Sequence, residues 1–120
     1  MQLVRPEDFD RIAKLGVVAV ANPFWFKKEF DEYEKLSLPF LGKKRAENQY
    51  PMKSLFDKGI LVTQATDYPV TTDINPLLGI QLGIIRQEVG LPETLLNPTE
   101  RVTFEQMIKA ATINETERMN

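Results

Sequence analysis

The chain has 120 residues, of which 42% are hydrophobic and 27% are charged, values typical of a globular protein. Its 15 Lys and Arg against 17 Asp and Glu give a net charge of −2, so there is no basic footprint for nucleic acid. Cysteine and histidine are absent, which excludes disulfides, histidine-based triads and imidazole metal sites within this chain. There is no apolar stretch of about 18 residues and no signal-peptide pattern, so we expect a cytoplasmic protein without membrane insertion.

The first expected elements are a helix and a strand. Pro6 suits the first position of a helix, and Gly16 can end it. The following apolar run, residues 17–21, is rich in β-branched residues and lacks alternation, which predicts a strand buried on both faces. The apolar face of the helix is formed by Phe9, Ile12 and Ala13.

An aromatic segment at residues 22–42 follows the first strand and holds six of the eleven aromatic residues. Phe26, Phe30 and Tyr33 have helical spacing, with charged residues on the other faces, and this predicts a short amphipathic helix. We favour a hydrophobic cover for the sheet over a substrate lid as the role of this segment.

A second helix and strand are expected next. Pro51 and Gly59 bound a helix that directs Met52, Leu55 and Phe56 inward. The second strand is predicted at residues 60–65, and the connection is long enough for a parallel pair. The polar loop at residues 66–73 lies at the carboxyl end of that strand, where α/β proteins place their chemistry.

Two further helices are expected after this loop. Asn75 caps a helix with Pro76 at its first position, and Gly79 and Gly83 permit close packing on a sheet. Thr103 and Gln106 form a capping box, with Val102 and Met107 as its hydrophobic staple. The buried stripe of that last helix is Phe104, Met107, Ile108 and Ala111. The polar residues 114–120 are expected to fray.

These elements predict an α/β chain with about two parallel strands and flanking helices. Buried parallel strands need neighbours at both edges, so such a sheet is unfinished. Three explanations are open. Further strands lie in apparent loops such as Met1–Val4, another chain completes the sheet, or the chain is part of something larger.

Four sequence segments carry a resemblance to a known family. QLVRPEDFDRIAKLGVVAVANP at 2–23 and NQYPMKSLFDKGILVTQATDYPV at 48–70 resemble the last two strands of a barrel with their helices. NPLLGIQ at 75–81 and LNPTERVTFEQMIKAATIN at 96–114 resemble the segments that follow. The family is that of the metal-dependent amidohydrolases, in the branch like N-substituted formamide deformylases. The resemblance implies that residues 1–120 are a single partial domain, a segment of a (β/α)8 TIM barrel.

The resemblance also implies a site. Asp67 matches the aspartate that binds the metal and moves the proton from the attacking water to the leaving nitrogen. Phe24, Trp25 and Tyr68 are expected to line the substrate pocket, and the metal of the intact enzyme is expected to be a divalent cation, zinc. Asp73 is expected to serve a cap or turn instead. The family's histidine ligands are missing, so we expect a fragment that binds no metal and has no activity by itself.

A noncatalytic alternative stays open. In it, the chain is a small α/β module that self-associates through its unpaired strands. The expected partner is therefore either a second copy or the missing half of a barrel. The one compact basic run, Lys43 to Arg45, is expected to be a solvated helix end and not a nucleic-acid site.

Overall fold

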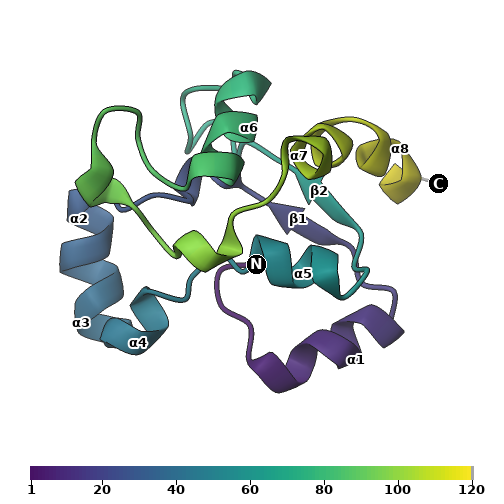
Figure 1. Cartoon of the computed structure of the whole chain (residues 1–120), viewed down its shortest axis with the longest axis horizontal. Coiled ribbons are helices and arrows are strands. Elements are labelled where there is room, and N and C mark those ends of the chain that lie inside the picture. The colour runs from purple at the N-terminus through teal and green to yellow at the C-terminus, as the bar shows by residue number, and fades with distance from the viewer. Residues whose placement is uncertain (120) are drawn as a thin grey trace.

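The structure is a computed structural model that describes residues 1–119 as a two-stranded parallel sheet surrounded by short helices (Figure 1). Single 3₁₀ turns that begin with proline lie at Pro6–Asp8, Pro23–Trp25, Pro92–Thr94 and Pro98–Glu100. The helices and strands are α1 (Phe9–Lys14), β1 (Ala19–Ala21), α2 (Phe30–Glu32), α3 (Leu38–Leu41), α4 (Lys43–Ala46), α5 (Met52–Asp57), β2 (Val62–Gln64), α6 (Pro76–Ile85), α7 (Phe104–Ala111) and α8 (Ile113–Met119). The expected α/β class is confirmed. None of the helices in this part of the chain is long and apolar enough to cross a membrane.

The two strands pair in parallel, with Ala19 opposite Val62 and Ala21 opposite Gln64. The connection between them contains α2 to α5, as the predicted crossover requires. Residues 1–4 form no strand, so the sheet gains no hidden member there. The Gln2 carbonyl instead accepts a 2.7 Å hydrogen bond from the Tyr50 amide.

One hydrophobic cluster joins both strands to four of the helices. It forms because apolar side chains from α1, α5, α6 and α7 meet on the strands, which removes their surface from water. Its buried members are Phe9, Ala19, Ala21, Phe26, Met52, Leu55, Ile60, Val62, Ile80, Val102, Met107 and Ala110.

The expectation that the first strand is buried on both faces is wrong. Val20 is 42% exposed, whereas Ala19 and Ala21 beside it are buried. Val17 is also exposed. Thr63, the partner of Val20 on the same face of the sheet, is fully buried, so the cover on that face reaches β2 but leaves Val20 of β1 exposed. The β-branched composition therefore predicted the strand but not its burial.

The aromatic segment forms a different helix from the one expected. Phe26 is buried but lies before the helix, and Phe30 is 72% exposed. The cause is a bridge between Lys27 and Leu95, supported by a 2.7 Å bond from the Lys28 amide to the Thr94 carbonyl. This bridge keeps the chain extended up to residue 29, so the helix begins only at α2 and continues through a π-helical turn at Tyr33–Ser37.

The helix after the second strand is as expected. The Asn75 side chain accepts a 3.0 Å bond from the Leu77 amide and so caps α6. A Cβ atom at Gly79 would collide with the Gln64 side chain, and one at Gly83 would collide with the Met107 sulfur. The glycines therefore allow α6 to approach both β2 and α7.

The last two helices agree only in part with the elements expected from the sequence. The Thr103 and Gln106 capping box is present at α7, and Met107 is fully buried. Phe104 was expected in the buried stripe but is 64% exposed. Residues 113–119 do not fray: they form α8, because the Asn114 amide donates a 2.8 Å bond to the Val62 carbonyl at the outer edge of β2. Residue 120 lies outside the described residues.

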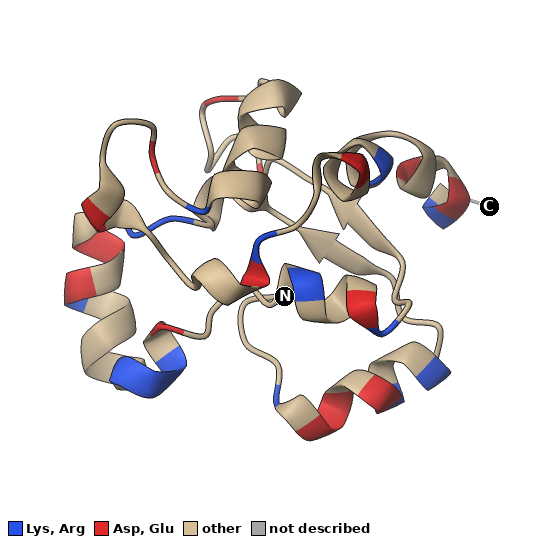
Figure 2. Cartoon of the chain, viewed as in Figure 1, with Lys and Arg blue, Asp and Glu red and all other residues tan. Residues whose placement is uncertain are grey.

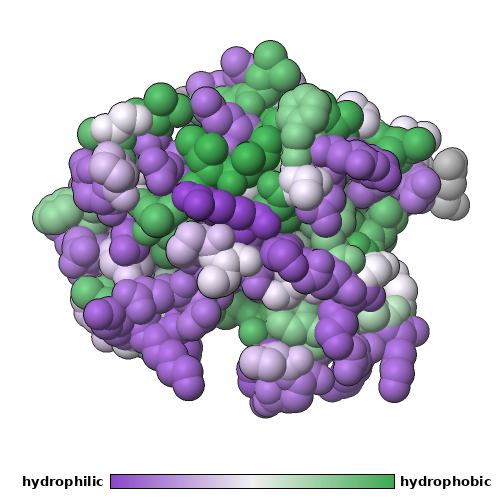
Figure 3. Space-filling view, in the orientation of Figure 1, coloured by the Kyte–Doolittle hydropathy of each residue, from purple (hydrophilic) through white to green (hydrophobic). Residues whose placement is uncertain are grey.

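The surface has no face of one charge in the view shown. Red and blue segments alternate along α1, α5 and α8 (Figure 2). The basic run in α4 is exposed, and the Lys43 ammonium lies 3.9 Å from the Glu47 carboxylate. Apolar side chains gather instead over α6, while α1 and α4 present hydrophilic groups (Figure 3).

Candidate functional site

The carboxyl ends of β1 and β2 lie side by side, because the strands are parallel and in register. The Asn22 amide donates a 3.2 Å bond to the Thr66 carbonyl, which links the two segments that leave the sheet. The Ala65 amide donates a 2.8 Å bond to the Ala21 carbonyl just before them. Side chains of both loops are thus presented at one end of the sheet, as the rule for open parallel sheets predicts.

Asp67 lies in the second of these loops and is exposed. Its φ of 60° places it in the left-handed region, which an aspartate tolerates better than most residues. The Asp67 carbonyl accepts a 3.1 Å bond from the Thr71 amide, and this bond fixes the turn. Such a backbone conformation at the end of a strand is a feature that functional sites often retain despite its cost.

Asp67 borders a cavity of about 400 Å³ at the ends of the strands, with Val20, Trp25 and Tyr50 among its other walls. A second carboxylate, Glu32 of α2, borders the same cavity. Burial, with the nearby charge of Glu29, raises the pKa of Glu32 above its usual range. The cavity is therefore bordered by one carboxylate from the loop after β2 and one from the helix that follows β1, and the sequence pattern pointed to only the first of them.

A second cavity of about 340 Å³ lies beside the first, and Trp25 lines both. Phe24 is buried and lines the second cavity, so the structure brings together two of the three residues expected at a substrate pocket. Tyr68 is 69% exposed and lines neither of these two cavities.

A metal ion does not fit the donors that this chain supplies. Within residues 1–119 no group of three His, Cys, Asp or Glu side chains could hold one. The Asp73 carboxylate accepts a 2.8 Å bond from the Asn75 amide and so belongs to a turn, as expected, and it borders the second cavity. Asp67 alone falls short of the three protein ligands of a catalytic zinc site.

Arg86 is a buried residue that the sequence analysis missed. It is fully buried after the end of α6, where its φ of 60° ends the helix. Its guanidinium donates to the carbonyls of Gln49, Tyr50 and Leu96 at 2.9 to 3.0 Å and lies 4.4 Å from the centre of the Phe26 ring. Burial lowers the pKa of Arg86 to about 10.

This contact set positions one wall of the site. Phe26 and Tyr50 pack with ring centres 5.3 Å apart, and Tyr50 borders the Asp67 cavity. Arg86 contacts the Phe26 ring and donates a hydrogen bond to the Tyr50 carbonyl, so it fixes the positions of both residues. The only signal in the sequence is an arginine that directly follows the apolar run of α6, which does not distinguish a buried cation from a helix-end cation.

Comparisons with known proteins agree on one family. The whole chain, residues 1–120, matches the amidohydrolase family. An N-substituted formamide deformylase from Arthrobacter pascens is 31% identical over 113 residues, which are 87% of this chain and 18% of that protein. An uncharacterized metal-dependent hydrolase from Pyrococcus furiosus shares the fold, with a TM-score of 0.70 and 23% identity over 97% of this chain and 22% of that one. The chain thus spans about a fifth of the length of each.

Proposed function

The chain belongs to the amidohydrolase family, and from this premise we propose that it forms the carboxyl-terminal part of a (β/α)8 barrel enzyme that hydrolyses a carbon-nitrogen bond of the amide type. The observation that carries the proposal is the position of Asp67, at the carboxyl end of β2 and on the wall of a 400 Å³ cavity. In barrel enzymes that end of the strands is where reacting groups are placed. The relative named for N-substituted formamides suggests the bond type.

The proposed role of Asp67 is general acid and base. As a carboxylate it accepts a proton from the water that attacks the amide carbon, and as the acid it then gives that proton to the leaving nitrogen. Both transfers require a side chain that reaches the reacting atoms, and Asp67 is exposed at the cavity. Phe24, Trp25 and Tyr68 are proposed to border the bound substrate, with Phe24 and Trp25 on the side of the second cavity.

Asp67 is also proposed as the one metal ligand that this chain supplies. Zinc is our proposal for the divalent metal of the whole enzyme, since such a site needs only three protein ligands. The remaining ligands would come from polypeptide outside these 120 residues. For that reason we expect the chain by itself to hydrolyse no amide, with or without added zinc, and measurable turnover by the purified chain would contradict this ligand count.

A segment exchange tests the role of Asp67. The part of this chain that aligns with the Arthrobacter pascens relative replaces the matching segment of that protein, and hydrolysis of an N-substituted formamide is measured. We expect the chimera to be active and Asp67→Asn to lower its kcat at least 100-fold, which is the usual lower range for a lost acid-base group. The matched control, Asp57→Asn, should retain activity because that carboxylate pairs with Lys53 on α5 and lines neither cavity. Equal activity of the two variants would contradict the proposal.

The open side of β1 favours a second candidate, a noncatalytic module that associates with a second copy. Val20 is 42% exposed, and the carbonyl of Val20 contacts only the amino terminus, at 3.3 Å, among the bonds that the structure describes. Light scattering over a concentration series tests this candidate. A dimer that Val20→Lys converts to a monomer would support this candidate. A chain that stays monomeric at every concentration and unfolds cooperatively would contradict it.

A further inference from the structure

The second cavity has no role in proton transfer, but its position is informative. It is formed by the same two loops that form the Asp67 cavity: the loop after β1 supplies Phe24 and Trp25, and the loop after β2 supplies residues 70–73. Trp25 borders both spaces. A molecule whose reacting bond lies beside Asp67 therefore has the second cavity as the adjoining space beyond Trp25.

The inner walls of the second cavity are apolar. Phe24 and Leu82 are buried at 6% and 3% exposure, and Leu78 is partly buried beside them. Its volume of about 340 Å³ lies within the range of small-molecule sites. An apolar group that enters it is removed from water, and this favours binding in proportion to the area buried.

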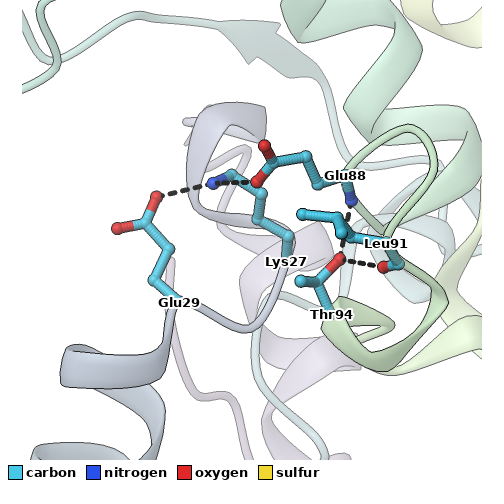
Figure 4. Close-up of polar contacts among 5 residues, drawn as sticks. All are labelled: Lys27, Glu29, Glu88, Leu91 and Thr94. Carbon is cyan, nitrogen blue, oxygen red and sulfur yellow. Dashed lines mark hydrogen bonds and ion pairs between the residues drawn. The ribbon is translucent and has the colours of Figure 1, made fainter.

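The mouth of this cavity is rich in carboxylates. Lys27 and Glu29 line it, and the Lys27 ammonium is bonded to Glu29 at 2.8 Å and to Glu88 at 3.3 Å (Figure 4). Asp73 lines the cavity as well. Burial alone would lower the pKa of Lys27, but the bonds to the two glutamates outweigh it and hold that pKa above its usual value. Lys27 is thus a cation that is already paired twice.

The pairing is held in place by a local turn. The Glu88 backbone amide donates a 2.8 Å hydrogen bond to the Thr94 hydroxyl, and that hydroxyl donates a 2.7 Å hydrogen bond to the Leu91 carbonyl. Figure 4 shows Glu88 directed toward Lys27 from this turn. An anionic ligand would have to compete with two fixed carboxylates for the one nearby ammonium, and it would meet a third carboxylate at Asp73.

We propose that the second cavity is a specificity pocket, which takes an uncharged apolar substituent on the substrate nitrogen and rejects a substituent that carries a carboxylate. This assignment rests on the proposed function, because it identifies the substituent as part of the amide that reacts beside Asp67. It names the substrate class as neutral N-substituted formamides in which the substituent fills a space lined by Phe24, Leu78 and Leu82.

Two matched probes test this pocket in the purified chain. N-(2-phenylethyl)formamide and N-formylphenylalanine differ by one carboxylate, and Trp25, the only tryptophan, reports binding by its fluorescence. We expect a saturable change with the neutral probe and an affinity at least about tenfold weaker for the carboxylate. N-methylformamide, which lacks the apolar group, should also bind at least about tenfold more weakly. Equal affinities, or no saturable change up to the solubility limit, would overturn the pocket.

Substitutions locate the binding. Thr71→Phe places a ring at the cavity wall, and because the Thr71 contact with Asp67 uses the backbone amide, the turn is retained. Thr71→Phe should lower the affinity for the neutral probe about tenfold or more, whereas Thr116→Phe on α8 should leave that affinity unchanged. The double change Glu29→Gln and Glu88→Gln should reduce the ratio of the affinities for the two probes at least about threefold. Asp57→Asn, which frees Lys53 away from the cavity, should leave that ratio unchanged. If Thr71→Phe binds the neutral probe as tightly as the unmodified chain, or if the double change leaves the affinity ratio unchanged, the assignment is overturned.

Failure of the pocket and failure of the proposed function give different results. Binding of the neutral probe with the expected preference, together with an inactive and correctly folded chimera, would overturn the catalytic proposal and leave the pocket. An active chimera that hydrolyses both formamides with equal kcat/KM would overturn the pocket and leave the catalytic role of Asp67.

Discussion

β1 and β2 are parallel, equally long and paired residue by residue, but their surroundings differ. In β2, Val62 and Thr63 are fully buried, and the outer edge is covered where Asn114 of α8 binds the Val62 carbonyl. In β1, Val20 is 42% exposed. The difference arises because α7 and α8, which follow both strands in the chain, pack on β2. Burial of a strand is therefore decided by the helices that reach it and not by its own composition.

The burial of the loops that follow the two strands differs in the opposite direction from the burial of the strands. The loop after β1 contains the buried residues Phe24 and Phe26, whereas Asp67 and Tyr68 after β2 are exposed. The less covered strand thus leads into the more firmly packed loop. Arg86 accounts for this, since it lies against the Phe26 ring and binds three carbonyls of segments that pack there.

The largest effect is expected from removal of that buried cation. Arg86→Met keeps most of the side-chain volume but removes three charge-assisted hydrogen bonds, at a cost of about 1 kcal/mol or more for each. The Gln49 and Tyr50 carbonyls keep bonds from Asn97 and from the Met52 amide, whereas the Leu96 carbonyl loses its donor among the described bonds. We expect the free energy of unfolding in urea to fall by at least about 3 kcal/mol. Arg101→Met is the matched control: it removes one bond to the Ile85 carbonyl at an exposed site and should cost less than about 1 kcal/mol. Equal losses would show that Arg86 does not hold the β1 side.

A smaller effect tests the two strands directly. Val62→Ala removes two methyl groups from a fully buried position and should cost about 2 kcal/mol. Val20→Ala makes the same change opposite Thr63 in the neighbouring strand, where 42% exposure should limit the cost to less than about 1 kcal/mol. Urea unfolding of both variants measures the difference. If Val20→Ala costs as much as Val62→Ala, the side of β1 is covered in solution, and a second copy is the candidate cover.

Short-range signals in the sequence predicted most elements of the fold. Asn75 and Thr103 accept the bonds expected of helix caps, because a cap depends on residues two or three positions away. Local sequence also predicted the close packing of α6 at its two glycines and the approximate positions of both strands. The family resemblance is confirmed by the match of the whole chain.

Long-range contacts produced the errors. Phe30 and Phe104 have the spacing of buried residues, yet both are exposed, since burial depends on which element lies opposite. The Lys27 to Leu95 bridge, which shifts the start of α2, joins residues far apart in sequence and has no local signal.

At the candidate site, Asp67 could be placed at the end of a strand from sequence, and the cavity there agrees with that placement. Its proposed role in proton transfer stays a prediction. Arg86 and Glu32 could not be assigned from sequence. Each is an ordinary charged residue at a helix, and only the folded chain brings one behind Phe26 and the other to the Asp67 cavity.

The smallest effect concerns the alkaline stability of the β1 side. Burial raises the pKa of Tyr50 well above its usual value near 10, so its phenol stays neutral in the folded chain while the unfolded chain ionises. The unfolded state then binds fewer protons, and stability that is fully present below about pH 10 is lost as the pH rises beyond it. Because Tyr50 is partly exposed, we expect a loss below about 1 kcal/mol between pH 9 and 11.

Urea unfolding at pH 9 and 11 measures this loss, and Tyr50→Phe should reduce it because phenylalanine has no proton to lose. Tyr68→Phe is the matched control, since that side chain is 69% exposed. Burial also raises the pKa of Tyr33, so part of the alkaline loss should persist in Tyr50→Phe. If Tyr50→Phe loses as much stability as the unmodified chain, the Tyr50 phenol is solvated in the folded state. The wall that Arg86 holds beside the Asp67 cavity would then be open to water, and the β1 side would lack the firm packing that distinguishes its loop from the loop after β2.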